Sequence, residues 1–188
     1  MKQKFKQGEY EYYNWKRNRE IIKTVAYFGI SLALLAAGYI ATGTKANLLT
    51  VVAVLGLLPA SKSMVGMIMY MRYHGCGKEH YEALKETLDK FNHAYGLVFT
   101  SYKKTYEVAG CIVKNGYVYG YLTNHQDMHE DLESHIEGIA KRNGHQITIA
   151  MYTKMDEFIE RLNQIADKKT ENEESDAKIM ELLHQISL

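Results

Sequence analysis

The sequence predicts a mixed α/β (α+β) cytoplasmic domain, in the element order α-β-β-β-α-β-α, behind an N-terminal transmembrane α-helical hairpin. The hairpin is indicated by two apolar runs: residues 24–43 contain no charged side chain, and residues 46–71 contain one, Lys62. Apolar runs of about 18 residues or more are typical of transmembrane helices. The domain is indicated by residues 78–167, where amphipathic helical patterns alternate with short β-type runs.

Residues 1–23 form a basic and aromatic lead before the first apolar run. They contain seven Lys/Arg but also three Glu, so they are too long and too acidic for the n-region of a cleaved signal peptide. Between the two runs the only basic residue is Lys45. Because Lys and Arg near helix ends stay on the cytoplasmic side, we expect a multi-pass protein of the cell membrane with both termini cytoplasmic.

The two predicted membrane helices cover about residues 24–43 and 47–71. Lys62 falls about 7 Å inside the inner face of the membrane at 1.5 Å per residue, a depth from which its ammonium group reaches the lipid headgroups. The alternative is a buried charge on a transport path, which requires an oligomer because two helices alone cannot line a path. The residues expected at the interface are Trp15, Lys62, Tyr70 and Arg72.

Small residues recur at a spacing of four in both apolar runs. They are Gly29, Ala33 and Ala37 in the first run and Gly56 and Ala60 in the second. Small side chains let membrane helices approach each other closely. The pattern predicts packing between the two helices of the hairpin or, alternatively, between the chains of a homo-oligomer.

A hinge is expected over residues 72–77, followed by the α/β domain over residues 78–167. The expected elements are a helix over 78–95, strands over 96–102, 105–114 and 117–123, a helix over 127–143, a strand over 146–151 and a helix over 153–167. The dipeptide Asn115–Gly116 favours a two-residue β-hairpin turn. Thr153 is the predicted N-cap of the last of these helices.

The C-terminal end divides into a polar segment and an amphipathic helix. Residues 168–175 are rich in charged and polar side chains, which predicts a flexible linker. Residues 176–188 place Ile179, Leu183 and Ile186 at helical spacing. We expect this last helix to dock on the domain or on a partner.

The element order of the domain is similar to the core of the restriction-endonuclease-like nucleases. That resemblance implies an acidic residue on the second strand and an acid-x-Lys motif on the third. Here the third strand reads YVYGYLT, without an acid or a lysine, and Glu107 on the second strand has no such partner. From Arg72 onward there are 14 Lys/Arg and 19 Asp/Glu, whereas nucleic-acid binders present a basic face. We therefore expect a degenerate nuclease-like fold at most, with no catalytic residues and no nucleic-acid partner.

Three stretches carry a second resemblance: the lead EYEYYNWKRNR, the hairpin sequence GYIATGTKANLLTVVAVLGLLPASKS and the following MYMRY. Through them the first 75 residues resemble short two-helix membrane proteins of Gram-positive anaerobic bacteria, a group without an assigned activity. The resemblance implies a membrane location and no particular reaction.

Candidate metal ligands and reactive thiols are few. His125 and His129 are four residues apart, a spacing that can chelate a metal on a helix; the alternative is two solvated histidines near a helix start. Cys76 lies among glycines beside the second apolar run, and Cys111 lies in a predicted strand. Two cysteines do not form a disulfide framework, and we expect no metal centre and no cofactor.

Tyrosines alternate along the third predicted strand. Tyr117, Tyr119 and Tyr121 form one face of this strand, and Tyr106 is expected to extend the stripe across the hairpin. Such a stripe can stack on a ligand or a partner. The alternative is a sheet face covered by a helix.

Together, these features predict a membrane protein that presents a small non-enzymatic interaction domain at the cytoplasmic face. Its expected partners are the lipid bilayer and either another protein or further copies of the chain. One alternative is a membrane-anchored small-molecule sensor or enzyme subunit with a pocket on the tyrosine face. Another is a component of an oligomeric transporter that uses Lys62.

Overall fold

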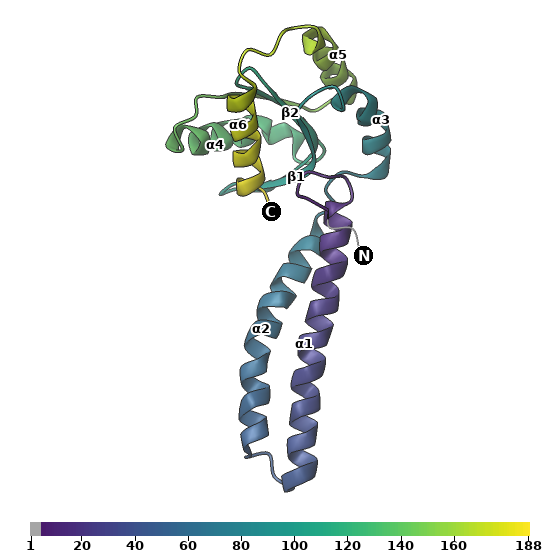
Figure 1. Cartoon of the computed structure of the whole chain (residues 1–188), viewed down its shortest axis with the longest axis vertical. Helices are drawn as coiled ribbons and strands as arrows, with labels where there is room; N and C mark the ends of the chain where they lie inside the picture. The colour runs from purple at the N-terminus through teal and green to yellow at the C-terminus, as the bar shows by residue number, and fades with distance from the viewer. Residues whose placement is uncertain (1–4) are drawn as a thin grey trace. The chain divides into compact units, whose positions relative to one another are not determined.

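The computed structural model describes residues 5–188, which form two compact units (Figure 1). The first is a helical hairpin over Tyr13–Tyr73. The second combines residues 5–12 with His74–Leu188 and has a mixed α/β fold. Each unit is described by itself below.

The hairpin unit consists of α1 (Tyr12–Thr42) and α2 (Leu48–Arg72), joined by a short loop. Helix α1 begins twelve residues before the predicted start at Thr24, because the charged residues of the lead are good helix formers that hydropathy alone does not detect. Asn47 caps α2 by accepting a hydrogen bond from the Thr50 amide at 2.9 Å. Pro59 lies inside α2, which continues past it to Arg72.

The two helices of the hairpin pack through small and polar side chains that recur mainly every seven residues. The buried positions are Tyr13, Glu20, Thr24, Ser31 and Gly38 in α1 and Ala53, Ala60 and Ser63 in α2. A seven-residue repeat keeps the contact line of two long helices in register. The hairpin is therefore closed by residues that permit a close approach of the two backbones.

The small residues of α2 face α1 as packing within the hairpin requires, whereas those of α1 do not, which leaves the homo-oligomer alternative for them. Ala60 is fully buried, and a side chain at Gly56 would meet the Ser31 hydroxyl at 2.7 Å. In contrast, Gly29, Ala33 and Ala37 are exposed. Each residue turns the side-chain direction by about 100° around a helix, so residues two apart lie on nearly opposite sides. Gly29 and Ala33 therefore lie on the side opposite Ser31, which faces α2.

The α/β unit is built on one four-stranded sheet in the order β1-β2-β3-β4. The strands are β1 (His93–Thr100), β2 (Thr105–Lys114), β3 (Tyr117–Leu122) and β4 (Thr148–Tyr152). The first three are antiparallel, and β4 pairs parallel to β3 after a crossover through η1 (Gln126–Met128) and α4 (His129–Arg142). Asn115 and Gly116 have φ of 53° and 75°, the left-handed pair that a tight β-hairpin turn requires.

Helices cover both faces of this sheet. On one face lie α3 (Lys78–Leu88) and α5 (Met155–Ala166), which contribute Leu84, Leu88, Phe158 and Leu162 to the core. On the other face lie α4 and α6 (Glu173–Ile186), which contribute Leu132, Ile136, Ile179 and Leu183. The C-terminal amphipathic helix therefore docks on its own domain.

Several predicted boundaries in the α/β unit are wrong. Helix α3 ends at Leu88, and β1 already begins at His93. The predicted helix is too long because Phe91 and Tyr95 fit a helical and an extended pattern equally well. Lys154 occupies the N-cap position of α5, so Thr153 is not its N-cap. Helix α6 begins at Glu173, inside the segment expected to be a linker, where Asn172 accepts a hydrogen bond from the Ser175 amide.

A β-bulge in β2 changes which face of the sheet its side chains occupy. The register between β2 and β3 shifts between Val108 and Gly110, and Ala109 and Ile112 share one core while Tyr106 and Val108 belong to the other. A bulge adds one residue to a strand and so reverses the alternation beyond it.

Both edges of the sheet are covered. At the β1 edge, the Tyr95 amide donates to the Gly8 carbonyl at 2.7 Å, and the Leu188 amide donates to the Val98 carbonyl at 2.9 Å. At the β4 edge, the Ile149 and Met151 amides donate to carboxylates of α4, those of Glu137 and Glu133. Unpaired sheet edges invite association with other strands, and these contacts occupy them.

The first part of the basic and aromatic lead belongs to the α/β unit. Besides the Gly8 contact, the side-chain amide of Gln7 donates to the Ser187 hydroxyl at 2.7 Å. The Tyr10 ring stacks on Tyr81 with centroids 4.0 Å apart. The expected hinge is also packed: Cys76 is buried, and the His74 amide donates to the Glu107 carboxylate at 3.2 Å.

Candidate functional site

The four predicted partner-binding tyrosines do not share one surface. Tyr119 and Tyr121 are buried beneath α3 and α5, while Tyr117 is 48% exposed. Tyr106 is fully buried in the opposite core, where its hydroxyl donates to Asp131 at 3.0 Å. The prediction that Tyr106 extends the stripe is therefore wrong, and the reason is the bulge at Ala109.

Tyr117 and Tyr119 line a cavity of about 230 Å³ beside the β2–β3 turn. Its lining residues are Lys114, Asn115, Tyr117, Tyr119, Arg161, Ile165 and Lys168. The two tyrosine rings are stacked, with centroids 6.1 Å apart and an interplanar angle of 19°. All the charged residues in this lining are cations, and we call this site the cationic tyrosine pocket.

Lys114 is the buried cation of this pocket. Its ammonium group donates to the carbonyls of Ile165 at 2.8 Å and Ala166 at 3.2 Å, and it lies 5.2 Å from the centre of the Phe91 ring. These carbonyls belong to the last turn of α5, where the helix dipole favours a positive charge. An ammonium group has three N–H donors, so these two bonds leave one donor for the pocket.

Arg161 and Lys168 supply the other two cations. The Arg161 guanidinium lies 5.7 Å from the centre of the Tyr119 ring and donates to the Gln164 amide oxygen at 3.4 Å. Within residues 5–188, none of the three pocket cations has an ion-paired carboxylate. Guanidinium and ammonium groups bind phosphate and carboxylate groups, so the pocket has the chemistry of an anion site.

Sequence reasoning found the two tyrosines of the pocket and missed its three cations. The sequence could have indicated Lys114, because it is a charged residue that ends a buried strand immediately before a tight turn. Arg161 and Lys168 follow it by about fifty residues, and only the packing of α5 on β3 brings them to the tyrosines.

The candidate metal pair His125 and His129 does not form a helical chelate. His125 has φ of 47°, in the left-handed region before η1, whereas His129 is the first residue of α4. The Lys104 ammonium also lies 3.5 Å from the His125 ring. Across residues 5–188 no group of three or more His, Cys, Asp or Glu side chains is placed to hold a metal ion.

Both cysteines are buried thiols. Burial raises the pKa of Cys76 to about 12 and that of Cys111 to about 12. Because the thiolate is the nucleophile and the metal ligand, neither side chain is activated for such chemistry at neutral pH.

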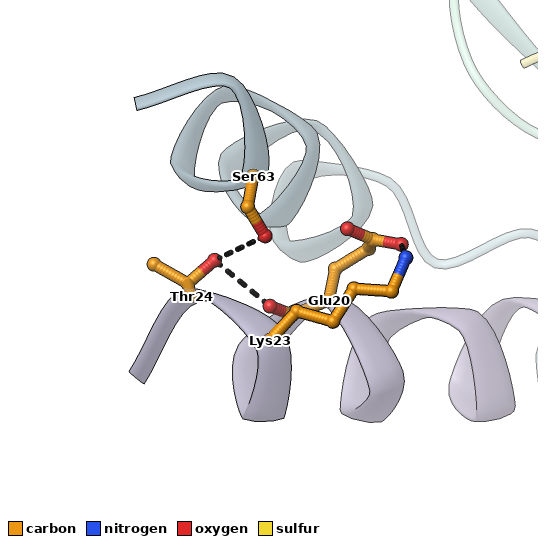
Figure 2. Close-up of polar contacts among 4 residues, drawn as sticks. All are labelled: Glu20, Lys23, Thr24 and Ser63. Atoms are coloured by element: carbon orange, nitrogen blue, oxygen red, sulfur yellow. Dashed lines mark hydrogen bonds and ion pairs between the residues drawn. The ribbon is translucent and has the colours of Figure 1, made fainter. Parts of the chain in front are cut away.

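A polar cluster lies at the α1–α2 contact of the hairpin unit. Figure 2 shows Thr24, which donates one hydrogen bond to the Glu20 carbonyl at 2.8 Å and is 3.0 Å from the Ser63 hydroxyl. The Glu20 carboxylate pairs with the Lys23 ammonium at 2.8 Å. The Thr24–Ser63 bond ties the two helices together at a defined register.

Lys62 is not part of this cluster. It is exposed, whereas the next residue, Ser63, is buried against α1. The side chain therefore lies on the outer surface of α2 and does not line the contact between the helices.

The other expected interfacial residues gather at the end of the hairpin where α1 begins and α2 ends. The Tyr13 and Tyr70 rings meet edge to face at 5.6 Å. Cations lie over neighbouring rings: Lys16 over Tyr70 at 5.9 Å, Arg19 over Trp15 at 5.3 Å and Arg72 over Tyr73 at 5.8 Å. Such a mixture of aromatic and basic side chains is typical of a membrane interface.

Comparison with family models, with curated proteins and with solved structures finds no match for this chain.

Proposed function

We propose that the chain is an integral membrane protein whose hairpin crosses the bilayer twice and anchors a cytoplasmic interaction domain. The observation that carries this proposal is the outer surface of α1 and α2. Both helices are long and apolar enough to cross a membrane. In each helix, only 17% of the apolar 18-residue segment is buried within the protein. A monomeric soluble protein rarely exposes an apolar surface of this size.

The charge distribution supports cytoplasmic termini. Seven Lys/Arg precede Thr24, whereas the loop between the helices contains only Lys45. Helix α1 is about 46 Å long at 1.5 Å per residue, longer than a hydrocarbon core of about 30 Å. The excess is the basic and aromatic start of α1, which belongs at the inner headgroups, and Lys62 reaches the same interface by extending its side chain.

The interaction domain is proposed to act on a protein partner or on a second copy of the chain. Both sheet edges are occupied, so we expect contacts through side-chain surfaces instead of strand addition. A homo-oligomer gains support from the exposed small residues Gly29, Ala33 and Ala37, because small residues favour helix contacts in membranes.

Membrane fractionation and size measurement test the two parts of this proposal. After an alkaline wash of membranes, the chain should stay with the bilayer, as integral proteins do; release into the wash would contradict the anchor. In mild detergent, the particle mass should exceed that of one chain plus its micelle. A monomer that copurifies with no protein in fixed ratio would contradict the interaction role.

A further inference from the structure

The cationic tyrosine pocket concentrates positive charge in a unit that is otherwise acidic. From Arg72 onward the chain has five more acidic than basic residues, yet the lining of this cavity includes Lys114, Arg161 and Lys168 and no acid. A concave site lined by one sign of charge focuses the electrostatic potential and attracts ions of the opposite sign.

The cations of the pocket keep donor capacity beyond the contacts that they make within the fold. Lys114 already offsets the Ile165 and Ala166 carbonyls, which would otherwise repel an anion from this end of α5. Arg161 lies over Tyr119 and hydrogen-bonds Gln164 and Tyr152, and because a guanidinium group has five N–H donors, donors remain for a ligand. Lys168 is exposed, two residues beyond the end of α5.

The size and the aromatic wall of the pocket narrow the ligand class. A cavity of about 230 Å³ is smaller than the sites of most drug-sized molecules. The half-exposed ring of Tyr117 offers a face on which a planar group can stack. We propose that the pocket binds a small phosphorylated ring compound, with its phosphate on Arg161, Lys168 and Lys114 and its ring against Tyr117.

The aromatic wall of the pocket favours a free molecule over a lipid headgroup, because the ligand is proposed to place a planar ring against Tyr117. The ligand is therefore assigned as a free molecule, and this inference is independent of the proposed membrane topology.

Calorimetric titration of the full-length protein in detergent micelles tests the site. The probes are p-nitrophenyl phosphate, inorganic phosphate and, as the uncharged-ring control, p-nitrophenol below its pKa. We expect the aryl phosphate to bind tightest, inorganic phosphate more weakly and p-nitrophenol not at all. Absence of binding by either phosphate would overturn the proposal.

Neighbouring lysines provide a matched pair of variants. Lys168 lines the pocket, while Lys169 does not and is joined to Asn115 only through its backbone carbonyl. Lys168→Gln and Arg161→Gln should each weaken aryl phosphate binding by about tenfold or more, with Lys169→Gln unchanged and all three variants unfolding at the wild-type temperature. Equal losses for Lys168→Gln and Lys169→Gln would show a diffuse charge effect and overturn the site.

Vesicles containing phosphatidic acid distinguish the two sources of phosphate. If the aryl phosphate binds and the vesicles do not displace it, the ligand is a free molecule, as proposed. If the α/β surface binds only the vesicles, in a manner lost in Arg161→Gln, a lipid headgroup is the ligand and the assignment is wrong.

Discussion

The hairpin and the α/β unit distribute the same kinds of residue in opposite ways. In the hairpin, Glu20, Thr24 and Ser63 are buried, while Ile30 and Ile40 are exposed. In the α/β unit, Leu84 and Phe158 are fully buried, and the charged side chains lie mostly at the surface. This difference is the one that the proposed membrane anchor predicts, because apolar burial stabilises a fold only where the alternative is water.

The largest expected effect is a cavity in the α/β core. Phe158→Ala removes a fully buried ring between α5 and the sheet and should lower the free energy of unfolding by about 3–5 kcal/mol. Ile30→Ala, at an exposed position of α1, should change it by less than about 0.5 kcal/mol. Denaturant titration followed by circular dichroism measures both in detergent, and equal losses would contradict a stabilising apolar core that is confined to the α/β unit.

The next effect concerns glycines in the two units. Gly8 has φ of +91°, and a side chain there would meet the His184 ring at 2.5 Å, whereas a side chain at Gly29 would meet no atom within 4 Å. Gly8→Ala should release residues 5–10 from the sheet edge at a cost of about 1–2 kcal/mol. Hydrogen exchange of the Tyr95 amide, which donates to Gly8, should accelerate in this variant and not in Gly29→Ala.

The stability of the α/β unit is expected to depend on pH through Asp131. Hydrogen bonds from Lys103, Ser101 and Tyr106 hold the pKa of Asp131 below its usual value, with the Lys103 bond as the largest cause. A depressed pKa means that the stabilisation is present above the unfolded-state pKa, near 4, and is lost as the pH falls through the folded-state value.

Asp131→Asn tests this contribution. The denaturant concentration at the unfolding midpoint of the wild type should decrease as the pH drops below 4. The midpoint of the variant should be lower than that of the wild type at pH 7 and should change less on acidification. If the midpoint of the variant changes with pH as steeply as that of the wild type, the acid sensitivity comes from other carboxyl groups.

The smallest expected effect is the loss of the hydrogen bond between the hairpin helices. Thr24→Val removes the 3.0 Å contact with Ser63 and should weaken the hairpin by about 0.6 kcal/mol, a typical value for such bonds in membranes. Ser61→Ala is the matched control, because its hydroxyl bonds only to the Leu57 carbonyl of its own helix. A reversible unfolding assay in mixed micelles compares the two, and a larger loss for Ser61→Ala would contradict the α1–α2 contact.

Local chemistry explains which features could be predicted from the sequence. Asn115–Gly116 specifies its own turn, so the two flanking strands followed from it. The outer apolar faces of α1 and α2 followed from composition alone. The start of α1 at Tyr12 did not, because hydropathy does not report a helix made of charged residues.

The parts that could not be predicted depend on packing between distant segments. A single extra residue at Ala109 moved Tyr106 to the opposite core, and no local pattern marks such a bulge. The cationic tyrosine pocket joins the β2–β3 turn to the end of α5, about fifty residues later, so its cations had no common motif. Contacts that form only in three dimensions leave no periodicity in the sequence.

Thiol labelling in intact cells tests whether the hairpin crosses the membrane and holds the α/β unit inside. The wild-type background should be low because Cys76 and Cys111 are buried and their pKa values are raised to about 12. Thr44→Cys places a thiol in the exposed α1–α2 loop, and Tyr102→Cys places one at a residue of the α/β unit that is 98% exposed.

A membrane-impermeant maleimide should label Thr44→Cys in intact cells and Tyr102→Cys only after the membrane is permeabilised. Labelling of Tyr102→Cys in intact cells, or of neither variant before permeabilisation, would contradict the proposed topology.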